Sequence, residues 1–187
     1  MKTLVCFLEE RSAQVLLETI LPKILNSSEI NFKYITFQGK QDLEKNLYQK
    51  LKGWKQPNSY FLVMRDKDAG DCIGIKENLK TITQNSGKIA ETCIRIACCE
   101  LESFYLGDLN AVQLGLKING LSNKQGKKTY RNPDLIIKPS IELEKLTARK
   151  YQKISGSRAI APHLKIDGSN KSKSFNELLK GIKKLVV

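Results

Sequence analysis

The chain has 187 residues, of which 41% are hydrophobic and 27% are charged. This length and apolar content suit one compact domain with a small appendage and exclude a globally disordered chain. The net charge of +13 favours a polyanionic partner such as nucleic acid, although a soluble, lysine-rich surface would give the same excess.

Membrane and secretory classes are excluded on similar grounds. No apolar stretch reaches the length of about 18 residues that spans a bilayer. The first ten residues are too short an apolar run, and turn acidic too early, to be a secretory leader. The five cysteines show no metal-type pairing, and three of them lie in apolar runs. We therefore expect a cytoplasmic protein without membrane association.

The first two thirds of the chain alternate between apolar runs of strand length and amphipathic stretches of helical spacing. Strands are expected over 2–8, 31–37, 60–64 and 91–98. Helices are expected over 13–21 (with Ser12 as a cap), 42–51, 71–84 and 100–116. This alternation predicts an α/β fold, a mostly parallel four-stranded sheet with helices on its faces.

The composition changes after Gly120. From Leu121 to the end, the chain has sixteen Lys or Arg residues and five Asp or Glu residues. We expect an exposed loop over 121–131, a helix over 141–150 capped by Ser140, and a basic amphipathic helix over 175–187. The predicted organisation is a core of residues 1–120 and a basic, mainly helical extension of residues 121–187 packed on it.

Carboxylates follow three of the predicted strands. They are Glu9 and Glu10 after the first, Asp66, Asp68 and Asp71 after the third, and Glu100 and Glu102 after the fourth. Ligands of parallel sheets gather at the carboxyl ends of the strands. Clustered carboxylates repel one another, and with no histidine or cysteine among them they suit Mg²⁺ or Mn²⁺. The alternative is that these acids cap helices and face water.

A second group of residues suits an anionic substrate. Ser155, Ser157 and Arg158 lie in a small, hydroxyl-bearing segment that a phosphate-holding turn would use, although an ordinary helix start is equally compatible. His163, the only histidine, is expected to be structural or exposed, not a metal ligand.

A first strand that ends in glutamate and a later strand that ends in Asp-x-Asp resemble the signature of the Toprim fold. That fold is shared by topoisomerases, primases, recombination proteins, small RNA-maturing nucleases and overcoming-lysogenization-defect nucleases. The segments 9–12, 39–45, 65–68, 100–108 and 155–161 resemble an uncharacterised bacterial family of Toprim-like proteins. Its members often lie beside a gene for an ABC-type ATPase, in loci suspected of phage defence.

The resemblance implies phosphodiester cleavage in DNA or RNA. Asp66 and Asp68 would bind one Mg²⁺, Glu9 or Glu10 would be a ligand or general base, and Glu100 or Glu102 would complete a second ion's shell. Asp71 is a further candidate ligand. Arg65, Lys67 and Arg158 would neutralise the phosphate as charge builds.

The chain also departs from the Toprim pattern. Glu10 and Arg11 stand where a glycine usually follows the first glutamate, which leaves open whether Glu9 or Glu10 faces the metal. Two other readings stay open beside the nuclease. One is a non-catalytic partner of an ABC-type ATPase, and the other is a small RNA-processing Toprim ribonuclease.

Overall fold

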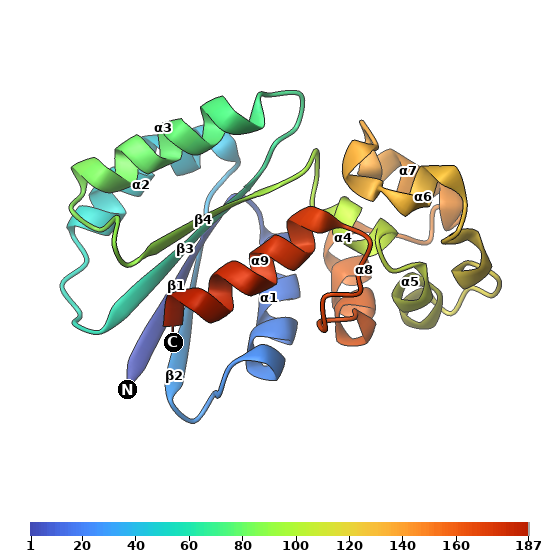
Figure 1. Ribbon diagram of the computed structural model, residues 1–187, viewed down its shortest axis with the longest axis horizontal. Coiled ribbons are helices and arrows are strands. Elements are labelled where there is room, and N and C mark those ends of the chain that lie inside the picture. Colours follow the sequence, from blue (N-terminus) through green and yellow to red (C-terminus); the bar gives the residue numbers. More distant parts are fainter. Residues whose placement is uncertain (187) are drawn as a thin grey trace.

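The computed structural model describes residues 1–186 and contains one four-stranded sheet (Figure 1). Its strands are β1 (Lys2–Leu8), β2 (Ile30–Thr36), β3 (Ser59–Asp66) and β4 (Thr92–Ala97). Their order is β2-β1-β3-β4, and each neighbouring pair is parallel. The predicted α/β fold with a four-stranded parallel sheet is therefore confirmed.

Helices cover both faces of the sheet. Within the sheet region they are α1 (Arg11–Ile24), α2 (Lys40–Lys52) and α3 (Cys72–Asn85). The remaining helices are α4 (Glu102–Leu106), α5 (Leu109–Leu116), α6 (Lys128–Arg131), α7 (Pro139–Leu146), α8 (Lys153–Ile160) and α9 (Lys173–Val186), with short 3₁₀ turns at Ser122–Lys124, Pro133–Leu135 and Ala161–His163.

The central strands β1 and β3 are buried on both faces, which explains their continuous apolar sequences. Alternate residues of β1 face different cores. Leu4 and Cys6 pack in the larger core with α1 and α9, whereas Val5 and Phe7 pack in the smaller core with α2 and α3. Full burial of one such side chain contributes roughly 1.5–3 kcal/mol.

The last helix returns to the sheet. Phe175, Leu178, Leu179 and Ile182 recur at helical spacing on one side of α9 and are buried. This side packs against β4, so α9 lies along the sheet while α5–α8 gather at one end of the molecule (Figure 1). The prediction of a closing helix is confirmed for 175–186, and Val187 lies outside the described residues. The division of the chain at residue 120 stays a prediction.

Several predicted boundaries are wrong. The expected helix over 100–116 is two helices, because Asp108 caps α5 by accepting the N–H of Ala111 (3.2 Å) and Gly107 lies against Asn170. A Cβ at Gly107 would lie 2.0 Å from the Asn170 Oδ1, so the chain turns where only glycine fits.

Two predicted helix caps are also wrong. The N-cap of α1 is Glu10. Ser12 lies inside the helix, and its hydroxyl donates to the Glu10 carboxylate instead of accepting a backbone N–H as a cap would. The N-cap of α7 is Lys138, and the helix ends at Leu146, before Ala148 and Arg149 take up left-handed backbone conformations. The expected exposed loop over 121–131 contains a 3₁₀ turn and the short helix α6.

Within residues 1–186, none of the helices has the length and apolar character required to cross a membrane.

Candidate active site

Three of the predicted acids, Glu9, Glu10 and Asp66, lie at the point of the sheet where successive strands are added on opposite sides of β1. The chain leaves β1 toward β2 on one side and β3 pairs with β1 on the other, so the carboxyl ends of β1 and β3 form the switch point of the sheet. Glu9 and Glu10 follow β1 directly, and Asp66 is the last residue of β3. The topology therefore brings residues 57 positions apart, Glu9 and Asp66, to the same point.

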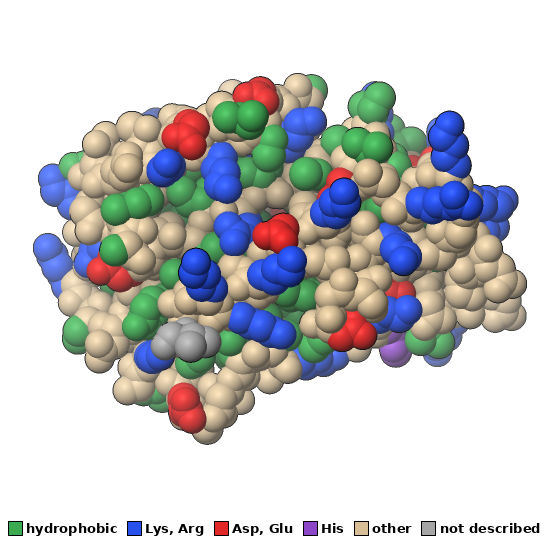
Figure 2. All heavy atoms as spheres, in the orientation of Figure 1, with side chains coloured by type: hydrophobic (Ala, Val, Ile, Leu, Met, Phe, Trp, Pro, Cys, Tyr) green, Lys and Arg blue, Asp and Glu red, His purple; other side chains and the backbone are tan. Residues whose placement is uncertain are grey.

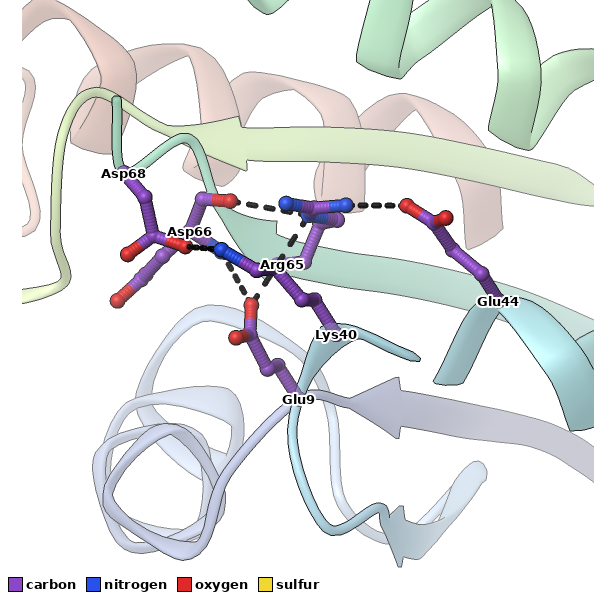
Figure 3. Close-up of polar contacts among 6 residues, drawn as sticks. All are labelled: Glu9, Lys40, Glu44, Arg65, Asp66 and Asp68. Atoms are coloured by element: carbon purple, nitrogen blue, oxygen red, sulfur yellow. Dashed lines mark hydrogen bonds and ion pairs between the residues drawn. The ribbon is translucent and has the colours of Figure 1, made fainter. Parts of the chain in front are cut away.

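Glu9 is fixed against β3 (Figure 3). Its Oε2 accepts a hydrogen bond from the backbone N–H of Asp66 at 2.9 Å and lies 4.0 Å from the Arg65 Nε. Arg65 is 5% exposed, and it also binds the Glu44 carboxylate and the Asp66 carbonyl. Burial raises the pKa of Glu9, while the Asp66 N–H and Arg65 act in the opposite direction.

Asp66 is the most strongly perturbed carboxyl of the site. It is 9% exposed. Burial, followed by the charges of Glu10, Glu102 and Glu9, raises its pKa well above the usual range, and the Leu101 N–H opposes this only in part. A carboxylate surrounded by three others in a buried setting needs a proton or a cation to be stable.

Glu102 completes this group from α4 and is fully buried. Its Oε1 accepts a hydrogen bond from the Tyr151 hydroxyl at 2.9 Å, whereas its buried Oε2 has no hydrogen-bond partner among residues 1–186. Burial raises the pKa of Glu102 despite the nearby Lys153 and the Tyr151 hydroxyl. An unpartnered buried carboxylate oxygen is costly in a protein interior, and it is available to a ligand.

Lys153, the first residue of α8, supplies a positive charge to the group. Its Nζ lies 3.0 Å from the Glu10 Oε2. Burial lowers the pKa of Lys153, but Glu10, Glu102 and Asp66 outweigh that effect and the pKa is raised. The sequence did not indicate Lys153 or Tyr151, because their contacts with Glu10 and Glu102 span 143 and 49 positions.

We call Glu9, Glu10, Asp66 and Glu102 the acidic group. The other three predicted acids have different partners. Asp68 has a left-handed backbone conformation, lies at the rim and pairs with Lys40 at 2.8 Å (Figure 3). Asp71 caps α3 by accepting the Gly74 N–H at 2.7 Å, and Glu100 accepts the N–H of Ser140 at the start of α7, also at 2.7 Å.

The predicted substrate-binding residues are also dispersed. Of the two readings left open for 155–158, the helix is the one observed, because Ser155, Ser157 and Arg158 lie inside α8. Ser157 is buried and donates to the Lys153 carbonyl, whereas Ser155 and Arg158 are exposed. Lys67 is half-buried between Asp66 and Asp68. His163 is exposed and is the last residue of the 3₁₀ turn Ala161–His163.

The acidic group offers the ligand atoms that a hard cation prefers, but its side chains are not arranged around a common point. Carboxylate oxygens are ligands that Mg²⁺ and Mn²⁺ prefer, and the free Glu102 oxygen fits such a role. Within residues 1–186, however, no three Asp, Glu, His or Cys side chains are arranged to hold a metal ion as they stand. As the side chains stand, the Glu10 carboxylate is paired with Lys153.

A family model described as "Domain of unknown function (DUF4276)" matches residues 8–183. The match includes the entire acidic group, Tyr151 and Lys153. No curated protein and no solved structure matches this chain.

Proposed function

This chain belongs to the DUF4276 family, whose description states no activity, and from the acidic group we propose that it is a Mg²⁺- or Mn²⁺-dependent phosphodiesterase that cleaves nucleic acid. The observation that carries the proposal is the burial of Asp66 among Glu9, Glu10 and Glu102, with one Glu102 oxygen left without a partner. Such an arrangement is destabilising on its own and is favourable when a divalent cation is shared.

Each residue has a role in this proposal. Asp66, Glu102 and Glu10 would hold the cation, which would supply Lewis-acid stabilisation and an activated water when bound. Glu9 positions β3 against β1 through the Asp66 N–H. Lys153, once released from Glu10, can pair with a phosphate oxygen of the substrate. Asp68 and Lys40 lie at the rim, where substrate would enter.

The proposal includes a Toprim-like relationship and a cytoplasmic location. The order of a glutamate after β1 and Asp-x-Asp after β3 supports the relationship. A role as an effector in phage defence, beside an ABC-type ATPase, rests on the family resemblance of the sequence alone.

A second function has its own supporting observation. Lys153, Lys40 and Arg65 already pair with Glu10, Asp68 and Glu44, so the site is partly neutralised without a metal. That compensation fits a non-catalytic partner of an ATPase complex.

The two functions are separated by a cleavage screen. Plasmid DNA, single-stranded DNA and transfer RNA are incubated with the protein and Mg²⁺ or Mn²⁺, with and without any neighbouring ATPase. We expect cleavage by the parent, a loss of at least about 100-fold in Asp66→Asn, and normal cleavage in Asp167→Asn, an exposed aspartate in a turn with Ser169. Equal cleavage by the parent and Asp66→Asn would disprove the assigned site.

A further inference from the structure

A continuous groove runs along the open edge of the sheet. Three adjoining hollows of about 370, 250 and 490 Å³ follow β4 from the C-terminal end of α9 to Lys67. The first two share Lys76, Ile94 and Arg95, and the second and third share Cys72, Ser174 and Glu177. We call this surface the edge groove. The helix α3 borders it on one face of the sheet and α9 on the other (Figure 1).

The edge groove is strongly basic. Its cations are Lys67, Lys76, Lys80, Arg95, Lys173 and Lys184, against the acids Asp134 and Glu177. The hollow farthest from the acidic group contains four of these cations and no acid. Figure 2 shows Lys and Arg side chains gathered over α3 and α9 in the middle of this face. A lining of this charge attracts a polyanion.

The structure argues against an added peptide strand as the occupant. The Phe61 and Lys67 N–H groups bond to the Glu91 and Ala97 carbonyls, so the carbonyl of Ile94 faces the open edge. The Arg95 guanidinium donates to that carbonyl and to the Glu177 carbonyl of α9. The open edge is therefore blocked at its centre, where an added strand would need free backbone groups.

Gly181 explains how Arg95 fits there. A Cβ at Gly181 would lie 2.2 Å from the Arg95 Nη2. The glycine in the middle of α9 therefore leaves room for a guanidinium between the helix and β4, and places a fixed positive charge on the groove floor.

The groove also leads to the acidic group. Lys67, at its far end, directly follows Asp66, and its backbone N–H bonds to Ala97 at the end of β4. A chain lying in the edge groove would reach the carboxyl ends of β4 and β3 in turn. Helices α3 and α9 border this path on its two sides.

We propose that the edge groove binds a single strand of nucleic acid through its phosphates and delivers it to the acidic group. Delivery to the acidic group rests on the proposed function, whereas binding in the groove does not. No aromatic side chain is among the groove residues that the structure describes, so base stacking contributes little and binding depends on salt more than on sequence.

The test measures binding without divalent ions, so that cleavage plays no part. Labelled single-stranded DNA is titrated, in EDTA and at several salt concentrations, with the parent and with the triple variant Lys76→Gln/Lys80→Gln/Lys184→Gln. All three lysines are exposed, and thermal unfolding checks that the variant is folded. The matched control is Lys127→Gln/Lys128→Gln/Lys150→Gln, which removes three exposed lysines of the extension.

We expect the groove variant to bind at least about tenfold more weakly, with the slope of log affinity against log salt reduced by roughly 2, since each phosphate contact on a single strand contributes about 0.7. The control should bind nearly as tightly as the parent. Equal losses in both triples, unchanged binding in the groove variant, or equal binding of a duplex or of a poly-glutamate peptide would overturn the inference.

The outcome is separable from the proposed function. Groove-dependent binding without any cleavage would leave the groove assignment standing and remove the phosphodiesterase. If the parent cleaves and the groove variant binds and cuts as well as the parent, the phosphodiesterase would stand and the groove assignment would fall.

Discussion

The carboxylate of Glu9 and the backbone N–H of Asp66 form a hydrogen bond of 2.9 Å that joins the end of β1 to the end of β3. In the proposed metal site, this bond makes Glu9 a positioning residue. The Glu9 Oε2 is held by the Asp66 N–H and lies near Arg65, and the Glu10 carboxylate is held by Ser12 and Lys153. Of the two glutamates, Glu10 does more to raise the pKa of Asp66. Glu9 thus positions the site, and Glu10 is the better candidate ligand.

The first prediction compares the two glutamates. Glu10→Gln should lower metal-dependent cleavage much more than Glu9→Gln, because a glutamine at position 9 can still accept the Asp66 N–H. Glu9→Ala, which cannot, should lower the free energy of unfolding by about 1–3 kcal/mol. Cleavage assays and denaturant unfolding measure these effects. A larger activity loss in Glu9→Gln than in Glu10→Gln would reverse the assignment.

The second prediction concerns pH. Burial raises the pKa values of Asp66, Glu9 and Glu102. As pH rises through the usual carboxyl range, the unfolded state loses these protons first, so the metal-free protein becomes less stable until the raised pKa values are passed. Each unit of difference in pKa costs about 1.4 kcal/mol.

Asp66→Asn should therefore be more stable than the metal-free parent at neutral pH, and its stability should depend less on pH between acid and neutral conditions. Added Mg²⁺ should stabilise the parent and not the variant. Asp167→Asn is the control, because the Ser169 hydrogen bonds lower the pKa of that exposed carboxyl and its replacement should bring no gain. Melting curves across pH check both variants. A parent that gains stability from mildly acidic to neutral pH, without metal, would contradict this account.

The third prediction separates two similar tyrosine–glutamate hydrogen bonds. Tyr151→Phe removes the only hydrogen bond to the side chain of Glu102 that residues 1–186 provide. We expect a loss of about 1–3 kcal/mol in unfolding free energy and a loss of cleavage, since Glu102 is no longer oriented. Tyr130→Phe removes the analogous bond from the Tyr130 hydroxyl to Glu142 (2.6 Å), outside the acidic group.

The control should lose stability but keep its metal-dependent activity. The measurements are denaturant unfolding and the Mg²⁺ concentration that gives half-maximal cleavage. Similar activities for Tyr151→Phe and Tyr130→Phe at saturating Mg²⁺, together with equal half-maximal concentrations, would mean that Glu102 has no part in the site.

The sequence was sufficient to predict the sheet and the meeting of Glu9, Glu10 and Asp66 at one of its edges, for a local reason. The apolar runs of β1 and β3 show burial on both faces, and acids at the ends of parallel strands must meet at one edge of the sheet. It was insufficient for the second half of the site. Tyr151 and Lys153 reach Glu102 and Glu10 from α8 and the segment before it, and no periodicity records a contact across 49 or 143 positions.

Asp71 and Glu100 were predicted as metal ligands but bind backbone N–H groups of helices instead. Each follows a strand as a ligand would, but Asp71 caps α3 and Glu100 accepts the N–H of Ser140 in the first turn of α7. A carboxylate after a strand is also the usual start of a helix. Only coordinates distinguish the two uses.

The last prediction concerns Lys153, whose ammonium lies 3.0 Å from Glu10 and near Glu102 and Asp66. Lys153→Met keeps the aliphatic length of the side chain and removes its charge. The metal-free variant should be less stable by up to about 1 kcal/mol, a modest loss because half of the side chain is exposed.

A divalent cation should then bind the Lys153→Met variant more tightly, because the cation no longer competes with the ammonium for Glu10. Cleavage should nevertheless fall, since Lys153 is proposed to pair with the substrate phosphate. Calorimetric Mn²⁺ titration and single-turnover cleavage measure the two effects, with Lys45→Met, an exposed lysine of α2, as the matched control. Weaker Mn²⁺ binding in Lys153→Met than in the control would show that Lys153 supports the cation site instead of competing for it.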